Sequence, residues 1–297
     1  MPLVHQSRLP WRRHRNTVAK VVAPAATLGR RPRRRWPRGT HPMTTPSRTL
    51  PIRGARNVRD LGGYATQDGR RIKFGRLVRA AELTDVTPAD RAYLADRVHV
   101  IADLRTSHER AERPTPPIEG VRNVHLPVFE QGGHDNNITK AVRAAAQGTL
   151  DEPPMLEVNR EFVTSELATR TYVELIDHVL GAPEDKAVLW HCTAGKDRTG
   201  MAAVILLVAL GVDEHTIYED YLETNEHLAE HVERIVGEIA DPTEAAVMRS
   251  FWVAKRSYLD AAFDEMRARF GSVDGYLRTA LGLDDAKREA LRAALLH

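Results

Sequence analysis

Sulfur is scarce in this sequence, and long apolar runs are missing. Cys192 is the only cysteine among the 297 residues, so neither an intramolecular disulfide nor a cysteine-rich metal site can form. A lone thiol suits a reducing compartment, and we therefore expect a cytoplasmic protein. The best apolar run, residues 201–210, is about half as long as a transmembrane helix needs to be. We expect no membrane span and predict that this run is a buried helix.

Acidic residues are absent from the first 42 positions, which carry eleven of the 43 Lys and Arg residues. The remainder of the chain is acidic on balance, so the formal net charge of +3 hides an asymmetry between the two parts. Pro and Arg dominate residues 31–38, where no apolar periodicity is present. Residues 1–45 are therefore predicted to be a disordered basic leader. Two alternatives are translation that starts at Met43 and an export signal.

Strand and helix patterns alternate from Thr49 onward. Strands are predicted at residues 72–79, 98–104, 121–126 and 187–190, and helices at residues 88–95, 160–180, 200–210, 213–238, 243–269, 272–281 and 284–296. Thr87 is a candidate N-cap, with Pro88 in the first turn. Residues 130–157 contain Gly, Asn and Pro and are predicted to form a long loop. This order predicts one α/β domain over residues 46–297, in which helices flank a central sheet.

A polar segment between the strand at 187–190 and the helix at 200–210 carries the chemistry. It consists of His191, Cys192, Thr193, Ala194, Gly195, Lys196, Asp197, Arg198 and Thr199. A thiol must ionise before it can attack, and inward-facing loop amides beside a helix N-terminus stabilise both a thiolate and a phosphate dianion. We predict that Cys192 is a nucleophile, that residues 193–198 bind phosphate through their amides, and that Arg198 grips two phosphoryl oxygens.

Three neighbours have predicted supporting roles. Gly195 lets the backbone curl close to the phosphate without a Cβ clash. Thr199 donates a hydrogen bond to the sulfur, and His191 orients the loop through backbone hydrogen bonds. The alternative for Cys192 is an inert core thiol. A His directly before it, a Gly three residues after it and an Arg six residues after it favour the phosphate loop.

The string His-Cys-x5-Arg-Thr resembles the phosphate-binding loop of protein tyrosine and dual-specificity phosphatases. The fuller string HCTAGKDRTG, at residues 191–200, is similar to the bacterial tyrosine and lipid phosphatases typified by the mycobacterial protein tyrosine phosphatase B. Segments at 57–64, 77–83, 102–106, 221–225 and 271–283 extend the resemblance over about residues 49–290. The basic leader lies outside it.

This resemblance implies a tyrosine phosphatase-like fold and hydrolysis of phosphotyrosine, with phosphoserine, phosphothreonine and phosphoinositides as further substrates. Cys192 would form a phosphocysteine that water then hydrolyses, and neither a metal nor another cofactor is needed. The implied partners are phosphorylated proteins or phosphoinositides, and no nucleic acid is required. The mycobacterial relative is secreted, which makes export the alternative to a cytoplasmic location. A non-catalytic phosphate-binding protein with the same loop is the alternative function.

The resemblance leaves the general acid open. Tyrosine phosphatases commonly use the aspartate of a Trp-Pro-Asp loop, which this sequence lacks. Asp197 is favoured for its proximity to Cys192, a placement similar to that in the myotubularin lipid phosphatases. Asp103 is the second candidate, because it ends a strand at the carboxyl edge of the sheet, where the sites of α/β proteins gather. The alternative for Asp103 is an ion pair with Arg105.

Further predictions concern the surroundings of the loop. Lys196 adds a positive charge beside the phosphate, which in the resembled family accompanies activity on phosphoinositides; its alternative is a solvated loop lysine. Arg59 and Asp60 are predicted to line the rim of the pocket, with a structural ion pair as the alternative. Parts of residues 224–260 are predicted to cover Cys192 as a lid, the alternative being helices that pack on the sheet.

Overall fold

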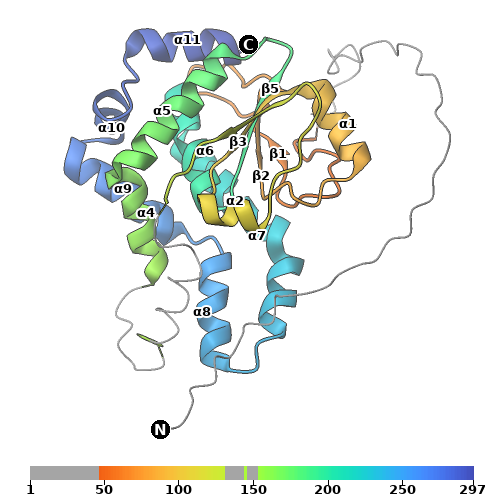
Figure 1. The fold of residues 1–297 in the computed structure, drawn as a ribbon. Helices are drawn as coiled ribbons and strands as arrows, with labels where there is room; N and C mark the ends of the chain where they lie inside the picture. Colours follow the sequence, from red (N-terminus) through yellow and green to blue (C-terminus); the bar gives the residue numbers. More distant parts are fainter. Residues whose placement is uncertain (1–46, 131–143, 146–152) are drawn as a thin grey trace, which may run out of the picture. The chain divides into compact units, whose positions relative to one another are not determined.

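A five-stranded sheet runs through the computed structural model, which describes residues 47–130, 144–145 and 153–297 (Figure 1). Its strands, in sheet order, are β1 (Arg59–Asp60), β2 (Leu77–Ala80), β5 (Ala187–His191), β3 (Val98–Asp103) and β4 (Arg122–His125). β1 is antiparallel to β2, and the other neighbouring pairs are parallel. The carboxyl ends of β2, β5 and β3 therefore meet at one edge of the sheet. The predicted leader and most of the predicted loop at 130–157 lie outside the described residues.

Side chains of the central strands alternate between two apolar layers. Val188 and Trp190 of β5 belong to the larger core, whereas Ala187 and Leu189 belong to the smaller one. Burial on both faces explains why this strand is almost continuously apolar in sequence. The α/β architecture with a central sheet and flanking helices is confirmed.

Helices cover both faces of the sheet (Figure 1). Those with described bounds are α1 (Pro88–Arg97), α2 (Ser107–Glu112), α4 (Pro154–Thr164), α5 (Glu166–Gly181), α6 (Asp197–Leu210), α7 (Glu214–Gly237), α8 (Pro242–Trp252), α9 (Arg256–Phe270), α10 (Val273–Thr279) and α11 (Asp285–Leu295). The predicted N-cap of α1 is confirmed, because the Thr87 side chain accepts a hydrogen bond from the amide of Asp90. No helix in the described part of the chain is long and apolar enough to cross a lipid bilayer.

Most predicted elements end within about three residues of the observed bounds, and three differ by more. The helix predicted at 160–180 is divided into α4 and α5, because Ser165 is extended and caps α5 through the amide of Ala168. The helix predicted at 243–269 is divided into α8 and α9. There Ala254 exchanges two hydrogen bonds with the Asn225 side chain, at 2.7 and 2.9 Å, which replace helical ones. The strand predicted at 72–79 begins only at Leu77, after a turn in which Gly75 has a φ of +76°.

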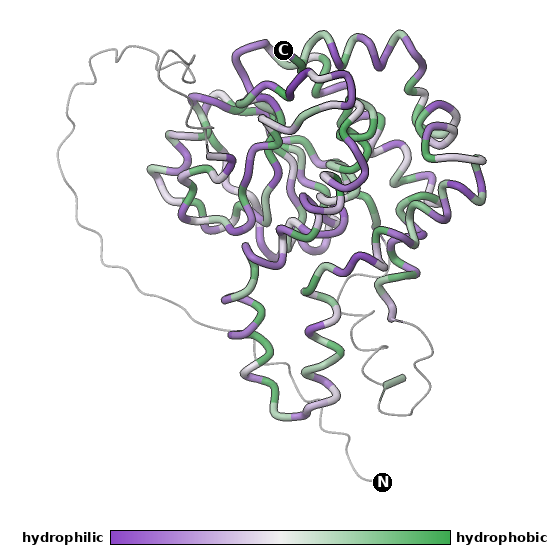
Figure 2. The backbone as a smooth tube through the Cα atoms, turned by 180° about the vertical axis from the view of Figure 1, so that it is seen from behind, coloured by the Kyte–Doolittle hydropathy of each residue, from purple (hydrophilic) through white to green (hydrophobic). Residues whose placement is uncertain are grey.

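α7 and α8 lie side by side (Figure 1). This helix pair contacts the loop that follows β5. Along both helices hydrophobic and hydrophilic residues alternate, as expected for amphipathic helices that pack on one another (Figure 2). Their shared apolar cluster contains Leu228, Val232, Val236, Ala245, Met248 and Trp252. Ala194, which follows Cys192 by two residues, packs against the same cluster. The helix pair is thereby fixed to the segment that the sequence identified as chemically important.

Candidate active site

The residues that connect β5 to α6, here called the 192–198 loop, form a tight turn at the carboxyl edge of the sheet. Trp190 ties the two elements together, since its indole Nε1 donates to the carbonyl of Thr199 at 3.0 Å. Cys192 is only 3 % exposed. α6 begins at Asp197 without a side-chain cap, so the positive end of the helix faces the loop.

The backbone of the 192–198 loop is polarised. Within the described residues, the amides of residues 193–198 donate no hydrogen bond to the protein. Its carbonyls are engaged from outside the loop: Thr193 by the amide of Glu82 at 3.2 Å, Ala194 by Asn57 Nδ2 at 3.1 Å, and Gly195 by Arg79 Nη2 at 2.8 Å. Six consecutive amides are therefore left for a ligand, as in an anion-binding nest.

Gly195 is required by its backbone conformation, for a reason that the sequence did not reveal. Its φ is +67°, a left-handed conformation that other residues rarely adopt. A Cβ atom would lie 2.5 Å from the carbonyl oxygen of Ala80 and 2.6 Å from the amide nitrogen of Ala81. The missing side chain thus makes room for the end of β2 behind the loop. In the described structure the clash that glycine avoids is with this strand, and close approach to a phosphate stays a prediction.

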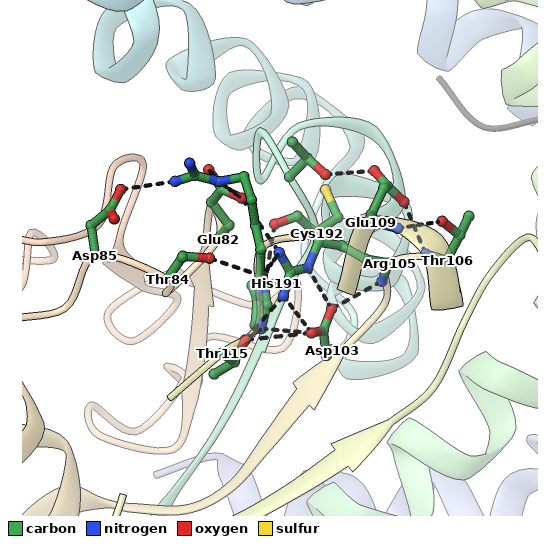
Figure 3. Close-up of polar contacts among 12 residues, drawn as sticks. Glu82, Thr84, Asp85, Asp103, Arg105, Thr106, Glu109, Thr115, His191 and Cys192 are labelled. Atoms are coloured by element: carbon green, nitrogen blue, oxygen red, sulfur yellow. Dashed lines mark hydrogen bonds and ion pairs between the residues drawn. The ribbon is translucent and has the colours of Figure 1, made fainter. Parts of the chain in front are cut away.

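Arg198 is held by Glu109 of α2, a residue that the sequence analysis did not select. Its Nη1 and Nη2 donate to the two carboxylate oxygens at 2.6 and 2.8 Å. Thr193 Oγ1 donates to the same carboxylate at 2.6 Å, and Figure 3 shows Glu109 on the same side as the sulfur of Cys192. Burial opposes ionisation of Glu109, but the hydrogen bonds and charge of Arg198 keep its pKa well below the usual range.

Asp197 receives two contacts from buried groups. The hydroxyl of Tyr221, on α7, donates to Oδ1 at 3.0 Å, and Nζ of Lys196 lies 3.4 Å from Oδ2. The side chain of Asp197 is 15 % exposed, whereas Tyr221 and Lys196 are both buried. The partly exposed carboxylate thus lies in the first turn of α6, where the loop ends.

Lys196 is not a solvated loop lysine, so that alternative is wrong, whereas a positive charge beside a bound phosphate stays a prediction. The side chain is fully buried, and Nζ donates to the carbonyls of Phe251 at 2.6 Å and Val253 at 3.2 Å. These carbonyls end α8, where a cation complements the helix dipole. Burial lowers the pKa of Lys196. The ammonium therefore fastens the loop to the α8 end, while a lid over Cys192 itself stays a prediction.

Asp103 forms the ion pair with Arg105 that was the alternative to a catalytic role. Arg105 Nε and Nη2 donate to its two oxygens at 2.9 and 2.7 Å (Figure 3). Burial would raise the pKa of Asp103, but His191 and Arg105 lower it to about 2. The ring of His191 lies 3.7 Å from the same carboxylate, and its Nδ1 lies 3.2 Å from the Cys192 carbonyl. These contacts agree with an orienting histidine.

Two predicted contacts differ in the structure. The Thr199 hydroxyl is buried and has no hydrogen-bond partner among the described residues, so it makes no bond to the sulfur. Arg59 and Asp60 do not line a rim, because both are fully buried, nor do they pair with each other. Arg59 binds Asp220, and Asp60 accepts the amides of Gly62 and Gly75 at 2.7 and 2.6 Å.

Comparisons with known proteins agree with this geometry. The model of the tyrosine phosphatase family matches residues 50–297. The chain belongs to this family. It is 35% identical over 233 residues to a Cupriavidus necator protein named, provisionally, a tyrosine-protein phosphatase, covering 78% of this chain and 83% of that protein.

Two further relatives of this phosphatase carry related names. The triple specificity protein phosphatase PtpB of Mycobacterium tuberculosis is 30% identical over 283 residues, which is 84% of this chain and 99% of that protein. A tyrosine-protein phosphatase of Nostoc commune is 25% identical over 232 residues, or 75% of each chain. The predicted family is confirmed, and the enzyme is a protein-tyrosine phosphatase.

Several residues of the phosphatase site were not predicted. Glu109 could have been found as the fourth residue of the string Thr-Ser-His-Glu, since Thr106 and Glu109 form a capping box at the start of α2. Asn57 and Arg79 lie in the segments NVRDLGGY and LVRAAEL, which carried the resemblance without a role for either residue. Asp220 precedes Tyr221 in α7, and nothing in the local sequence marks it as buried.

Proposed function

We propose that this tyrosine phosphatase hydrolyses phosphotyrosine monoesters with Cys192 as nucleophile, through a phosphocysteine intermediate. The observation that carries the proposal is the polarised 192–198 loop: a thiol at its base, six amides without acceptors in the described protein, and one guanidinium beside them. Such a field favours a thiolate and then the dianion of a bound phosphoryl group.

In the first step the Cys192 thiolate forms a bond to phosphorus, and the bond from phosphorus to the tyrosyl oxygen breaks. The leaving oxygen takes a proton from a carboxylic acid. In the second step the carboxylate accepts a proton from water, the water oxygen bonds to phosphorus, and the sulfur–phosphorus bond breaks. The products are tyrosine, inorganic phosphate and the original thiolate. The loop amides and Arg198 stabilise the equatorial oxygens in both steps.

The contacts support Asp197 as the general acid and base. Both oxygens of Asp103 are taken by Arg105, and its pKa of about 2 keeps it ionised, so it holds no proton to give. Asp197 lies in the first turn of α6 with part of its carboxylate exposed. Tyr221 fixes Oδ1 by a hydrogen bond, and Nζ of Lys196 lies 3.4 Å from Oδ2.

Glu109 is proposed to aim Arg198. In the described part of the chain, the contacts of Arg198 use only the two terminal nitrogens, and Nη2 also makes a long contact of 3.5 Å with Thr193 Oγ1. The edge formed by Nε and Nη2 can grip two phosphoryl oxygens when a phosphoryl oxygen replaces Thr193. A bidentate carboxylate partner holds the plane of the guanidinium in one orientation.

For substrates, phosphotyrosine in proteins is proposed first, with phosphoserine and phosphothreonine as slower substrates. Triple specificity in the name of a relative supports a broad range. Activity on phosphoinositides was expected from a positive charge of Lys196 beside the phosphate, but the Lys196 ammonium is engaged by the carbonyls of Phe251 and Val253. We therefore expect phosphoinositides to be poor substrates.

The test compares turnover and binding in matched variants. Wild type should release phosphate from a phosphotyrosine peptide, and Cys192→Ser should bind the same peptide without turnover. Asp197→Asn should slow phenyl phosphate more than p-nitrophenyl phosphate, because the weaker leaving group depends more on the acid, whereas Asp103→Asn should slow both equally. Full turnover by Cys192→Ser would refute the covalent route. Binding without turnover in wild type would favour the non-catalytic alternative.

A further inference from the structure

Asn57 has a backbone conformation that is costly for a residue with a side chain. Its φ is +53°, and no other non-glycine residue in the described ranges has a positive φ. Asn tolerates this region better than most residues, but the conformation still has a cost and is kept where surrounding contacts determine it. The residue is 3 % exposed, so its amide must also find partners.

Those partners are carbonyls of the 192–198 loop. Asn57 Nδ2 donates to Ala194 at 3.1 Å and to Gly195 at 2.9 Å. Arg79, at the end of β2, donates through Nη2 to Gly195 at 2.8 Å and to Lys196 at 3.3 Å. Three successive carbonyls are thus held on the outer side of the loop by two side chains.

The two side chains are themselves fixed by a buried network. The Asn57 Oδ1 atom accepts from Nη1 of Arg59, and Nε of Arg59 donates to Asp220 Oδ1 at 3.1 Å. Nη1 of Arg79 donates to the other oxygen of Asp220. All members of this network are buried, and such charges are expensive to desolvate and contribute little net stability. Stability alone is therefore a poor explanation for them.

A peptide plane that points its carbonyl outward points the following amide to the opposite side. Carbonyls of residues 194, 195 and 196 held outward leave the amides of residues 195, 196 and 197 facing the concave side, where they meet a bound anion. We infer that Asn57 and Arg79 are positioning residues for the catalytic loop: they hold its carbonyls outward so that its amides stay aimed at the phosphoryl group. This inference rests on the proposed function and extends it.

A glycine variant separates the side chain from the backbone. Asn57→Gly keeps a left-handed conformation accessible and removes the whole side-chain amide, both the Nδ2 donor to the loop and the Oδ1 acceptor of Arg59. We expect kcat/KM for p-nitrophenyl phosphate to fall at least about tenfold and the inhibition constant of vanadate to rise by a similar factor, because both depend on the amides. The acid limb of the kcat/KM profile should also move to higher pH, as the thiolate loses stabilisation.

Arg79→Lys is the second variant, with Arg76→Lys as its matched control. Arg76 is also a buried arginine that donates to backbone carbonyls, those of Ala182 and Glu184, away from the loop. Both lysine variants should lower Tm, but only Arg79→Lys should weaken vanadate binding and turnover. Wild-type kcat/KM and vanadate affinity in folded Asn57→Gly would overturn the inference. Failure of the proposed function is distinguishable, since wild type would then lack turnover while calorimetric vanadate binding still compares the variants.

Discussion

Arginine–aspartate pairs occur both behind the 192–198 loop and on α10 and α11, but the first are buried and the second are exposed to solvent. Arg59, Arg79 and Asp220 are almost completely buried. Arg278 and Asp274, on α10, pair at 2.8 Å with half-exposed side chains. Exposed pairs are screened by water and contribute little, whereas buried ones require every partner to be present. Substitutions should therefore have very different effects in the two regions, although the contacts look alike.

The largest effect is expected for Asp220→Ala. The substitution leaves two buried guanidinium groups without their counter-ion, and we expect a loss of about 3–5 kcal/mol in the free energy of unfolding. Urea denaturation measures it. Burial would raise the pKa of Asp220, but the neighbouring arginines lower it to about 2. The contribution of Asp220 to the free energy of unfolding is therefore complete above the unfolded pKa of 3.8 and is lost as the pH falls toward 2. A loss below about 1 kcal/mol would remove the contrast with the surface pairs.

Asp60 should produce the opposite pH dependence. Burial raises its pKa from 3.8 to about 6, so the folded chain keeps its proton longer than the unfolded chain. The protonated carboxyl therefore contributes to the free energy of unfolding at low pH. This contribution, at most about 3 kcal/mol, is lost as the pH rises to about 6. The difference in unfolding free energy between wild type and Asp60→Asn over about pH 4 to 6 isolates it, because histidines with lowered pKa, such as His231, affect both proteins alike. Equal slopes for the two proteins would show that Asp60 titrates normally.

Glu109→Gln should have a moderate effect on catalysis. The amide keeps the shape of the side chain but loses the charge that holds Arg198, and we expect kcat/KM to fall about tenfold with a small change in Tm. Inhibition by vanadate decides between two roles of Glu109. Weaker inhibition fits a residue that aims Arg198, whereas stronger inhibition would mean that the carboxylate competes with the phosphoryl group.

The smallest effect is expected for Arg278→Ala. The side chain is exposed and pairs with Asp274 and Asp285 on the surface, so its removal should shift Tm by less than about 1 °C and leave turnover unchanged. Thermal unfolding beside Asp220→Ala provides the direct comparison. A larger shift would show that the α10–α11 surface network is cooperative.

The sequence predicted the sheet and the loop because both depend on local patterns. β5 and β3 are short apolar strands with obvious boundaries, and the Cys192 loop follows one of them directly. The helix breaks at Ser165 and Ala254 were missed. The break at Ala254 depends on hydrogen bonds with the side chain of Asn225, which is distant in sequence. Apolar periodicity continues across such breaks and does not reveal them.

Site residues far from the loop in sequence were also missed. Arg198 and Cys192 lie in one segment, so their proximity could be inferred. Glu109, Asn57 and Arg79 reach the loop only through the order of the strands, which brings three carboxyl ends to one edge. The sequence indicated that Lys196 and Arg59 lie near the loop, but not where their side chains point. Their burial depends on helices that cover them and that follow much later in the chain.

A crystal structure with orthovanadate tests the central claim most directly. We predict a bond between vanadium and Sγ of Cys192, with the equatorial oxygens accepting from the amides of residues 193–198 and from Arg198. Carbonyls of Ala194 and Gly195 should still point toward Asn57 and Arg79. Vanadate bound away from the sulfur, or a loop whose carbonyls face the anion, would contradict it.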